Sequence, residues 1–105
     1  MRKKVHQLIK SLIPYGPERL YLFGSWGRGE EDDLSDLDVV VIKQTEVPFL
    51  DRLREVASLV PVDIGGVDIL VYTPAEFAAM QQDGNAFAEM IAEEARLIYD
   101  RQTKK

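Results

Sequence analysis

Three aspartates carry the first chemistry that this sequence could perform. Asp36 and Asp38 stand two residues apart, directly before the apolar run Val39–Ile42, and Asp68 lies in the later run Val67–Tyr72. Residues two apart in a strand point to the same face, so the first two carboxylates project together, about 7 Å apart along the strand. If the two strands are neighbours, Asp68 lies roughly 5 Å to the side and three carboxylates converge.

Converging carboxylates repel one another, and a divalent cation relieves that repulsion. Mg²⁺ takes oxygen ligands and keeps sites for water or substrate phosphate, and two such ions, bridged by carboxylates, serve in-line phosphoryl displacement. A simpler alternative stays open from the residues alone. In that alternative Asp36 caps a turn, Asp38 is a charge at a strand edge and Asp68 is a surface acid.

A glycine–serine pair adds a second chemical feature upstream of the aspartates. Gly24 and Ser25 follow the β-rich run 19–23 and precede a segment, 26–31, that could open a short helix. Glycine lets the backbone approach a phosphate closely, and the N–H groups at a helix start attract anions. Arg28 could then meet a phosphate or a structural carboxylate. A phosphate cradle followed by acids on two strands is a layout for metal-assisted nucleotide chemistry.

Strands that alternate with helices must position these residues. Thr73 and Glu76 form a predicted capping box with Pro74 at the first helical position, so a helix begins there. Residue patterns predict strands at 19–23, 37–43, 67–72 and 96–99, and helices at 3–13, 48–60, from 74 onward and 85–94. This order predicts an α/β or α+β domain.

Composition limits the class of protein. The chain has 105 residues, which predicts one domain over 1–105, and no cysteine, which excludes disulfides and thiolate metal sites. No apolar run is long enough for a membrane span, so a cytoplasmic location is expected. The net charge of −5 gives no long-range attraction for nucleic acid, so direct nucleic-acid binding is not expected. The lysines near the ends, namely Lys3, Lys4, Lys10, Lys104 and Lys105, read as solvated.

Several other residues are assigned ordinary roles. His6 is expected on the first helix, beside its apolar stripe, in a surface or edge role. The acidic run 30–33 is expected in a solvated loop, and Asp63 ranks well below Asp68 as a ligand. Trp26 has three open interpretations: it stacks on a base, it anchors a partner, or it packs against the local turn.

The combined motif resembles the minimal nucleotidyltransferase family of the polymerase-β-like superfamily. That family has an apolar strand, then Gly-Ser-x-Ala-Arg-Gly, then Ser-Asp-x-Asp before an apolar run, and a later strand aspartate. This chain has Gly-Ser-Trp-Gly-Arg-Gly at 24–29, Ser-Asp-Leu-Asp at 35–38 and Asp68. Arg96–Asp100 resembles the closing strand of the family, and Gly27 departs from it by standing where alanine is usual.

The resemblance implies a fold, a reaction and a partner. The fold is a mixed sheet of about four strands flanked by helices. Asp36, Asp38 and Asp68 become catalytic and metal-binding acids, with two Mg²⁺ ions, and Gly24, Ser25 and Arg28 become the nucleotide-binding residues.

The implied reaction transfers AMP from ATP to a hydroxyl. Small members of the family often pair with a helical HEPN toxin and silence it by adenylylating a tyrosine, so the chain is expected to be such an antitoxin. Two alternatives remain: an antitoxin that acts by binding alone, and a transferase for a small-molecule acceptor that works as a homodimer.

Overall fold

One mixed β-sheet forms the centre of the fold. The computed structural model describes residues 3–24, 26 and 36–102. The sheet contains β1 (Arg19–Phe23), β2 (Leu37–Ile42), β3 (Val67–Tyr72) and β4 (Arg96–Asp100). The strand order is β3-β2-β1-β4; β2 and β3 run parallel, while β1 is antiparallel to both β2 and β4. The predicted fold class, a mixed sheet of about four strands flanked by helices, is confirmed.

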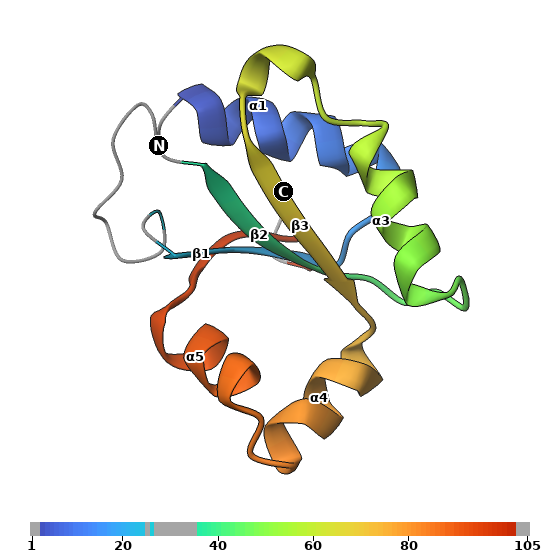
Figure 1. The fold of residues 1–105 in the computed structure, drawn as a ribbon, viewed down its shortest axis with the longest axis vertical. Coiled ribbons are helices and arrows are strands. Elements are labelled where there is room, and N and C mark those ends of the chain that lie inside the picture. The colour runs from blue at the N-terminus through green and yellow to red at the C-terminus, as the bar shows by residue number, and fades with distance from the viewer. Residues whose placement is uncertain (1–2, 25, 27–35, 103–105) are drawn as a thin grey trace.

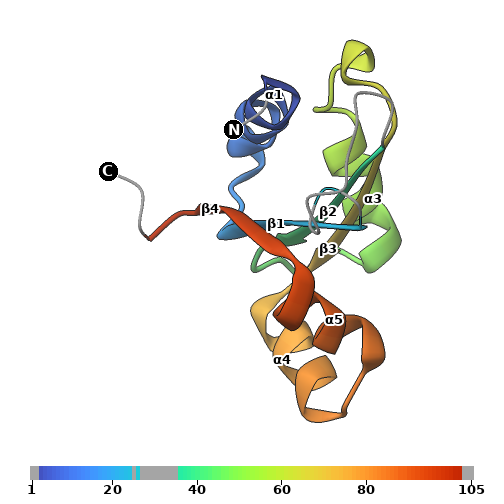
Figure 2. The same ribbon diagram turned by 90° about the vertical axis from the view of Figure 1, so that its left-hand side faces the viewer.

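Helices cover both faces of this sheet (Figure 1 and, turned by 90°, Figure 2). One face carries α1 (Lys3–Leu12) and α3 (Phe49–Ala57), and the other carries α4 (Pro74–Gln82) and α5 (Ala86–Glu94). Two single 3₁₀ turns complete the described elements, η1 (Ile13–Tyr15) after α1 and η2 (Val62–Ile64) before β3.

Alternation along β2 divides the core into two layers. Val39 and Val41 pack with the buried residues of α1 and α3, whereas Val40 and Ile42 pack with Ile91 of α5. A strand that is apolar on both faces is central in its sheet, as β2 is here between β3 and β1. Asp38 has the same parity as Val40 and Ile42, so its side chain lies on the α4–α5 face.

The helix boundaries follow local signals. The predicted capping box is present: the Thr73 hydroxyl accepts from the Glu76 N–H at 3.1 Å, and the Glu76 carboxylate accepts from the Thr73 N–H at 2.8 Å. The helix predicted for 48–60 ends at Ala57. The Leu59 N–H bonds back only three residues, to Val56, and a residue that precedes proline, as Val60 does, disfavours helical backbone.

A buried arginine ties three elements together. Arg52 on α3 is only 5% exposed, and its guanidinium makes two bonds to the Glu76 carboxylate, at 2.7 and 3.0 Å. It also donates to the carbonyls of Val47 and Val71, at 2.7 and 3.1 Å. A buried guanidinium is stable only when its donors are paired, so this network fixes α3 against β3 and the start of α4. Sequence patterns did not predict this network.

In the described ranges 3–24, 26 and 36–102, no helix is both long enough and apolar enough to cross a membrane.

Candidate active site

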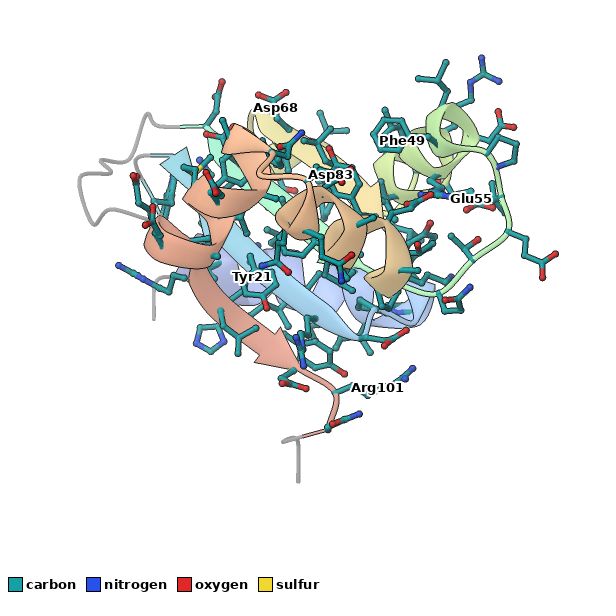
Figure 3. All side chains as sticks on the ribbon, turned by 90° about the horizontal axis from the view of Figure 1, so that it is seen from below. Tyr21, Phe49, Glu55, Asp68, Asp83 and Arg101 are labelled. Carbon is teal, nitrogen blue, oxygen red and sulfur yellow. The ribbon has the colours of Figure 1, made fainter. Side chains whose placement is uncertain are left out.

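The candidate site lies at the end of the sheet where β1 ends and where β2 and β3 begin. Parallel strands start at the same end of a sheet, and an antiparallel neighbour finishes there. The register pairs Phe23, the last residue of β1, with Asp38, and pairs Asp38 with Asp68. The condition stated from the sequence, that the strand carrying Asp68 neighbours the strand carrying Asp38, is met, and Figure 3 labels Asp68.

Asp38 and Asp68 form the chemical centre of this end. They are Cα partners on the adjacent strands β2 and β3. The pKa of Asp38 is raised, first by burial and then by the negative charges of Asp68 and Asp36. Neighbouring carboxylates repel each other, and a cation bound between them relieves that repulsion. The pair therefore suits a site that receives positive charge.

Asp36 lies next to this pair but outside the strand. It stands immediately before β2 and is exposed, and its charge acts on Asp38. The structure thus brings the three predicted acids to one end of the sheet. Among the residues that the structure describes, however, no group of three or more acidic or histidine side chains is arranged to hold a metal ion.

The donor chemistry of the three acids nevertheless fits a hard divalent cation. Carboxylate oxygens are the ligands that Mg²⁺ takes, and Mg²⁺ usually needs only one or two protein carboxylates beside substrate phosphates. Asp38 and Asp68 supply such a pair on adjacent strands, and the negative charge of Asp68 raises the pKa of Asp38. The assignment of Asp36, Asp38 and Asp68 as metal ligands stays a prediction.

Gly24 lies next to the Asp38 carboxylate in the candidate site. Its φ is +67°, a left-handed conformation that side-chain-bearing residues rarely adopt. A Cβ at this position would also collide with the Asp38 carboxylate Oδ2. The left-handed backbone therefore requires glycine here, and the missing side chain leaves room for the Asp38 carboxylate. The Gly24 backbone therefore lies close to the Asp38 carboxylate, and the role of this turn in phosphate binding stays a prediction.

The remaining predicted nucleotide-binding residues, Ser25 and Arg28, lie outside the described residues. The same holds for the predicted short helix beyond Trp26 and for the acidic run 30–33.

Trp26 belongs to the core of the protein. It is 2% exposed and packs in the cluster formed by α1, α3 and one face of the sheet. Of the three open interpretations, packing is the one that the structure supports. Lys4 lies beside it, with its Nζ 5.9 Å from the centroid of the Trp26 ring. Lys4, expected in a solvated tail, is a partly exposed residue of α1.

Asp68 is the most approachable of the paired acids. It is exposed, and β3 is an edge strand of the sheet. A groove of about 400 Å³ between α3 and β3 includes Asp68 in a lining that is otherwise mostly apolar. The position of Asp68 on an edge strand leaves it accessible to solvent. Asp63, ranked below Asp68 from the sequence, is an exposed residue of η2.

Sequence reasoning gave no role to Gly66, which the structure places directly against the Asp36 carboxyl group. The only signal was a glycine pair, Gly65-Gly66, directly before a strand, which reads as an ordinary turn.

The comparison with protein families settles the class of this chain. The family described as Polymerase beta, Nucleotidyltransferase matches residues 6–104. The chain belongs to this family. Its enzyme class is therefore nucleotidyltransferase, as the motif predicted.

Individual relatives agree with this class. A Methanocaldococcus jannaschii protein named "putative protein adenylyltransferase" is 33% identical over 66 residues, which are 63% of this chain and 71% of that protein. A crystal structure titled "putative nucleotidyltransferase" from Sulfolobus solfataricus has a TM-score of 0.67 at 22% identity, over 96% of this chain and 81% of that one. A structure titled "toxin-antitoxin with AMP-PNP" has a TM-score of 0.60 at 20% identity, over 96% of this chain and 76% of that one. The two structures share the fold of this nucleotidyltransferase.

Proposed function

We propose that this nucleotidyltransferase transfers AMP from ATP to a hydroxyl of a partner protein. The observation that carries the proposal is the register pairing of Asp38 with Asp68 beside the left-handed turn at Gly24. This places paired carboxylates next to a backbone that can approach phosphate closely. We further propose that residues 1–105 act as one nucleotidyltransferase domain.

The residues divide the reaction between them. The turn at Gly24, with Ser25 and Arg28, holds the triphosphate, while Asp36 and Asp38 hold its associated cations. Two Mg²⁺ ions, when bound, neutralise the phosphate charge and stabilise the attacking and leaving oxygens. Asp68, the exposed acid, accepts the proton of the acceptor hydroxyl.

The covalent change is a single displacement at the α-phosphorus of ATP. The acceptor oxygen forms a bond to that phosphorus, and the bond from the phosphorus to the β-phosphate oxygen breaks. Pyrophosphate leaves, and AMP remains on the acceptor. The protein contributes position and charge compensation rather than a covalent intermediate.

We propose that the acceptor is a tyrosine of a HEPN-type toxin and that the transfer silences this toxin. Support comes from the relative named as a protein adenylyltransferase and from the structural neighbour titled as a toxin–antitoxin complex. The exposed edge position of Asp68 leaves room for a protein acceptor. The proposed donor, ATP, is a cytoplasmic metabolite, and we place the protein in that compartment. The net charge of −5 argues against a nucleic-acid acceptor.

The test is transfer of α-labelled AMP onto the candidate partner in the presence of Mg²⁺. We expect label on the partner with the wild type, and a loss of at least about 100-fold with Asp38→Asn, the scale of one group that stabilises transition-state charge. Asp63→Asn changes an exposed acid of η2 and serves as the matched control, with transfer retained. Retained transfer in the Asp38→Asn variant would rule out the proposed site.

The same variants separate the alternatives. If Asp38→Asn neutralises the toxin as well as the wild type does, the protein is an antitoxin that acts by binding alone. If label passes only to small alcohols and never to a partner protein, the acceptor class is wrong.

A further inference from the structure

Gly66 stands directly against the carboxyl group of Asp36. Each residue immediately precedes a strand, and the two strands begin with the register pair Leu37 and Val67. The Leu37 N–H donates to the Gly66 carbonyl at 3.0 Å, which holds the two approaches to the sheet together. The parallel pairing therefore places Asp36 and Gly66 side by side, one step before the sheet begins.

The absence of a side chain at Gly66 makes room for this carboxyl group. A Cβ there would collide with Asp36 Oδ1, and it would lie 2.6 Å from Cγ and 3.0 Å from Oδ2. All three of its nearest neighbours would be atoms of the Asp36 carboxyl group. Carbon and oxygen in ordinary contact are separated by about 3.3 Å or more, so the carboxyl group would have to leave its position.

The backbone at Gly66 does not itself require glycine. Gly16, Gly24, Gly65 and Gly84 have positive φ, and Gly66 is absent from this group. Alanine is therefore compatible with its backbone, and the atoms displaced belong to the end of an exposed, rotatable side chain. The requirement for glycine at this position comes from the Asp36 carboxylate and not from the fold.

We infer that Gly66 is a positioning residue for the active site, which acts by letting Asp36 lie against the start of β3. This inference rests on the proposed function, because it assigns Asp36 a role in binding the metal–nucleotide complex. A side chain at Gly66 turns the carboxylate of Asp36 away and leaves Asp38 and Asp68 with one acid fewer beside them. Binding of Mg²⁺ with ATP then weakens while the fold persists.

The test compares Gly66→Ala, which displaces a neighbouring side chain, with Gly84→Ala, which strains the backbone instead. A Cβ at Gly84 would meet nothing within 4 Å, but its φ is +71°, so Gly84→Ala strains the backbone far from the acids. We expect Gly66→Ala to keep or raise the melting temperature of the free protein and to lose most of the rise produced by Mg²⁺ with ATP. Gly84→Ala should lower the melting temperature and keep that rise. The Mg²⁺ concentration for half-maximal effect should increase about tenfold or more in Gly66→Ala.

A double variant tests whether Gly66 acts through Asp36. In the Asp36→Asn background the carboxylate is already lost, so adding Gly66→Ala should cause no further loss of ligand response. Losses that add would show that Gly66 acts in another way and would overturn the inference. A wild-type response to Mg²⁺ and ATP in Gly66→Ala would overturn it too, while leaving the proposed function intact. A wild type without any response would overturn both.

Discussion

Asp38 and Asp68 are register partners on the adjacent parallel strands β2 and β3, at the end of the sheet where β1 finishes. This position opposes folding for Asp38, because its ionised carboxylate loses water and meets the negative charges of Asp68 and Asp36. A protein retains such an arrangement when the acids bind something that folding alone does not need. The acid pair should therefore lower the stability of the free protein while it serves the proposed function.

Asp38→Asn should make the free protein more stable at neutral pH while it abolishes AMP transfer. The pKa of Asp38 is raised on folding, so its ionised form destabilises the native state above that pKa, and this cost disappears as the pH falls below it. Each 1 kcal/mol gained raises the melting temperature by roughly 4–8 °C in a domain of this size. Melting curves at pH 7 and pH 4 should show a gain that shrinks at the lower pH. A variant less stable than the wild type at pH 7 would contradict the argument.

Glu76→Ala should be one of the more destabilising single changes on the α4 side. It leaves the guanidinium of Arg52 buried without its carboxylate, and it also removes half of the capping box at Thr73. Since the Glu76 side chain is 43% exposed, we expect a loss of about 2–3 kcal/mol, below the range for a fully buried pair. Urea denaturation measures this loss. Glu89→Ala, in the first turn of α5, is the control and should cost less than about 1 kcal/mol.

The Arg52–Glu76 pair should also make the free energy of unfolding depend on pH in the acidic range. The pKa of Glu76 is lowered, first by its hydrogen bond with Arg52, from an unfolded value of 4.5. Stability from this ionised group is therefore fully present above about pH 4.5 and is lost as the pH falls through the lowered folded pKa. The difference in unfolding free energy between wild type and Glu76→Gln should narrow from pH 6 to pH 3. Parallel curves over that range would show that the pair contributes no pH dependence.

Ionisation of Tyr15 should lower the stability of the protein at high pH. Its hydroxyl donates to Glu55 at 3.2 Å, and burial together with this bond raises its pKa from 10.0 to about 12. The native state favours the neutral phenol, so stability from Tyr15 is present below pH 10 and is lost as the pH rises toward 12. Urea midpoints at pH 8 and pH 11 should fall more in the wild type than in Tyr15→Phe. Equal decreases in the urea midpoints of both proteins would show that other groups cause the loss of stability at high pH.

Local signals in the sequence were sufficient for the elements and for the family. The β-rich run of β1, the apolar run of β2 and the capping box at Thr73 and Glu76 depend on neighbouring residues alone. Each is found where it was predicted, with β2 ending one residue earlier than expected. The end of α3 was placed three residues too late, because its hydrophobic spacing continues to Val60 while the backbone before Pro61 leaves the helix. The Gly-Ser motif and the spaced aspartates identified the family for the same reason, since a motif is a local property.

Only the tertiary structure decided which distant residues meet. The parallel register of β2 and β3 sets Asp38 beside Asp68 and Gly66 beside Asp36, and a shift of one residue would have sent the partner side chain to the other face. The burial of Trp26 and the pairing of Arg52 with Glu76 likewise come from elements far apart in the chain. Sequence patterns report periodicity and short-range bonds, whereas register and long-range pairing are chosen by the packing of the whole core.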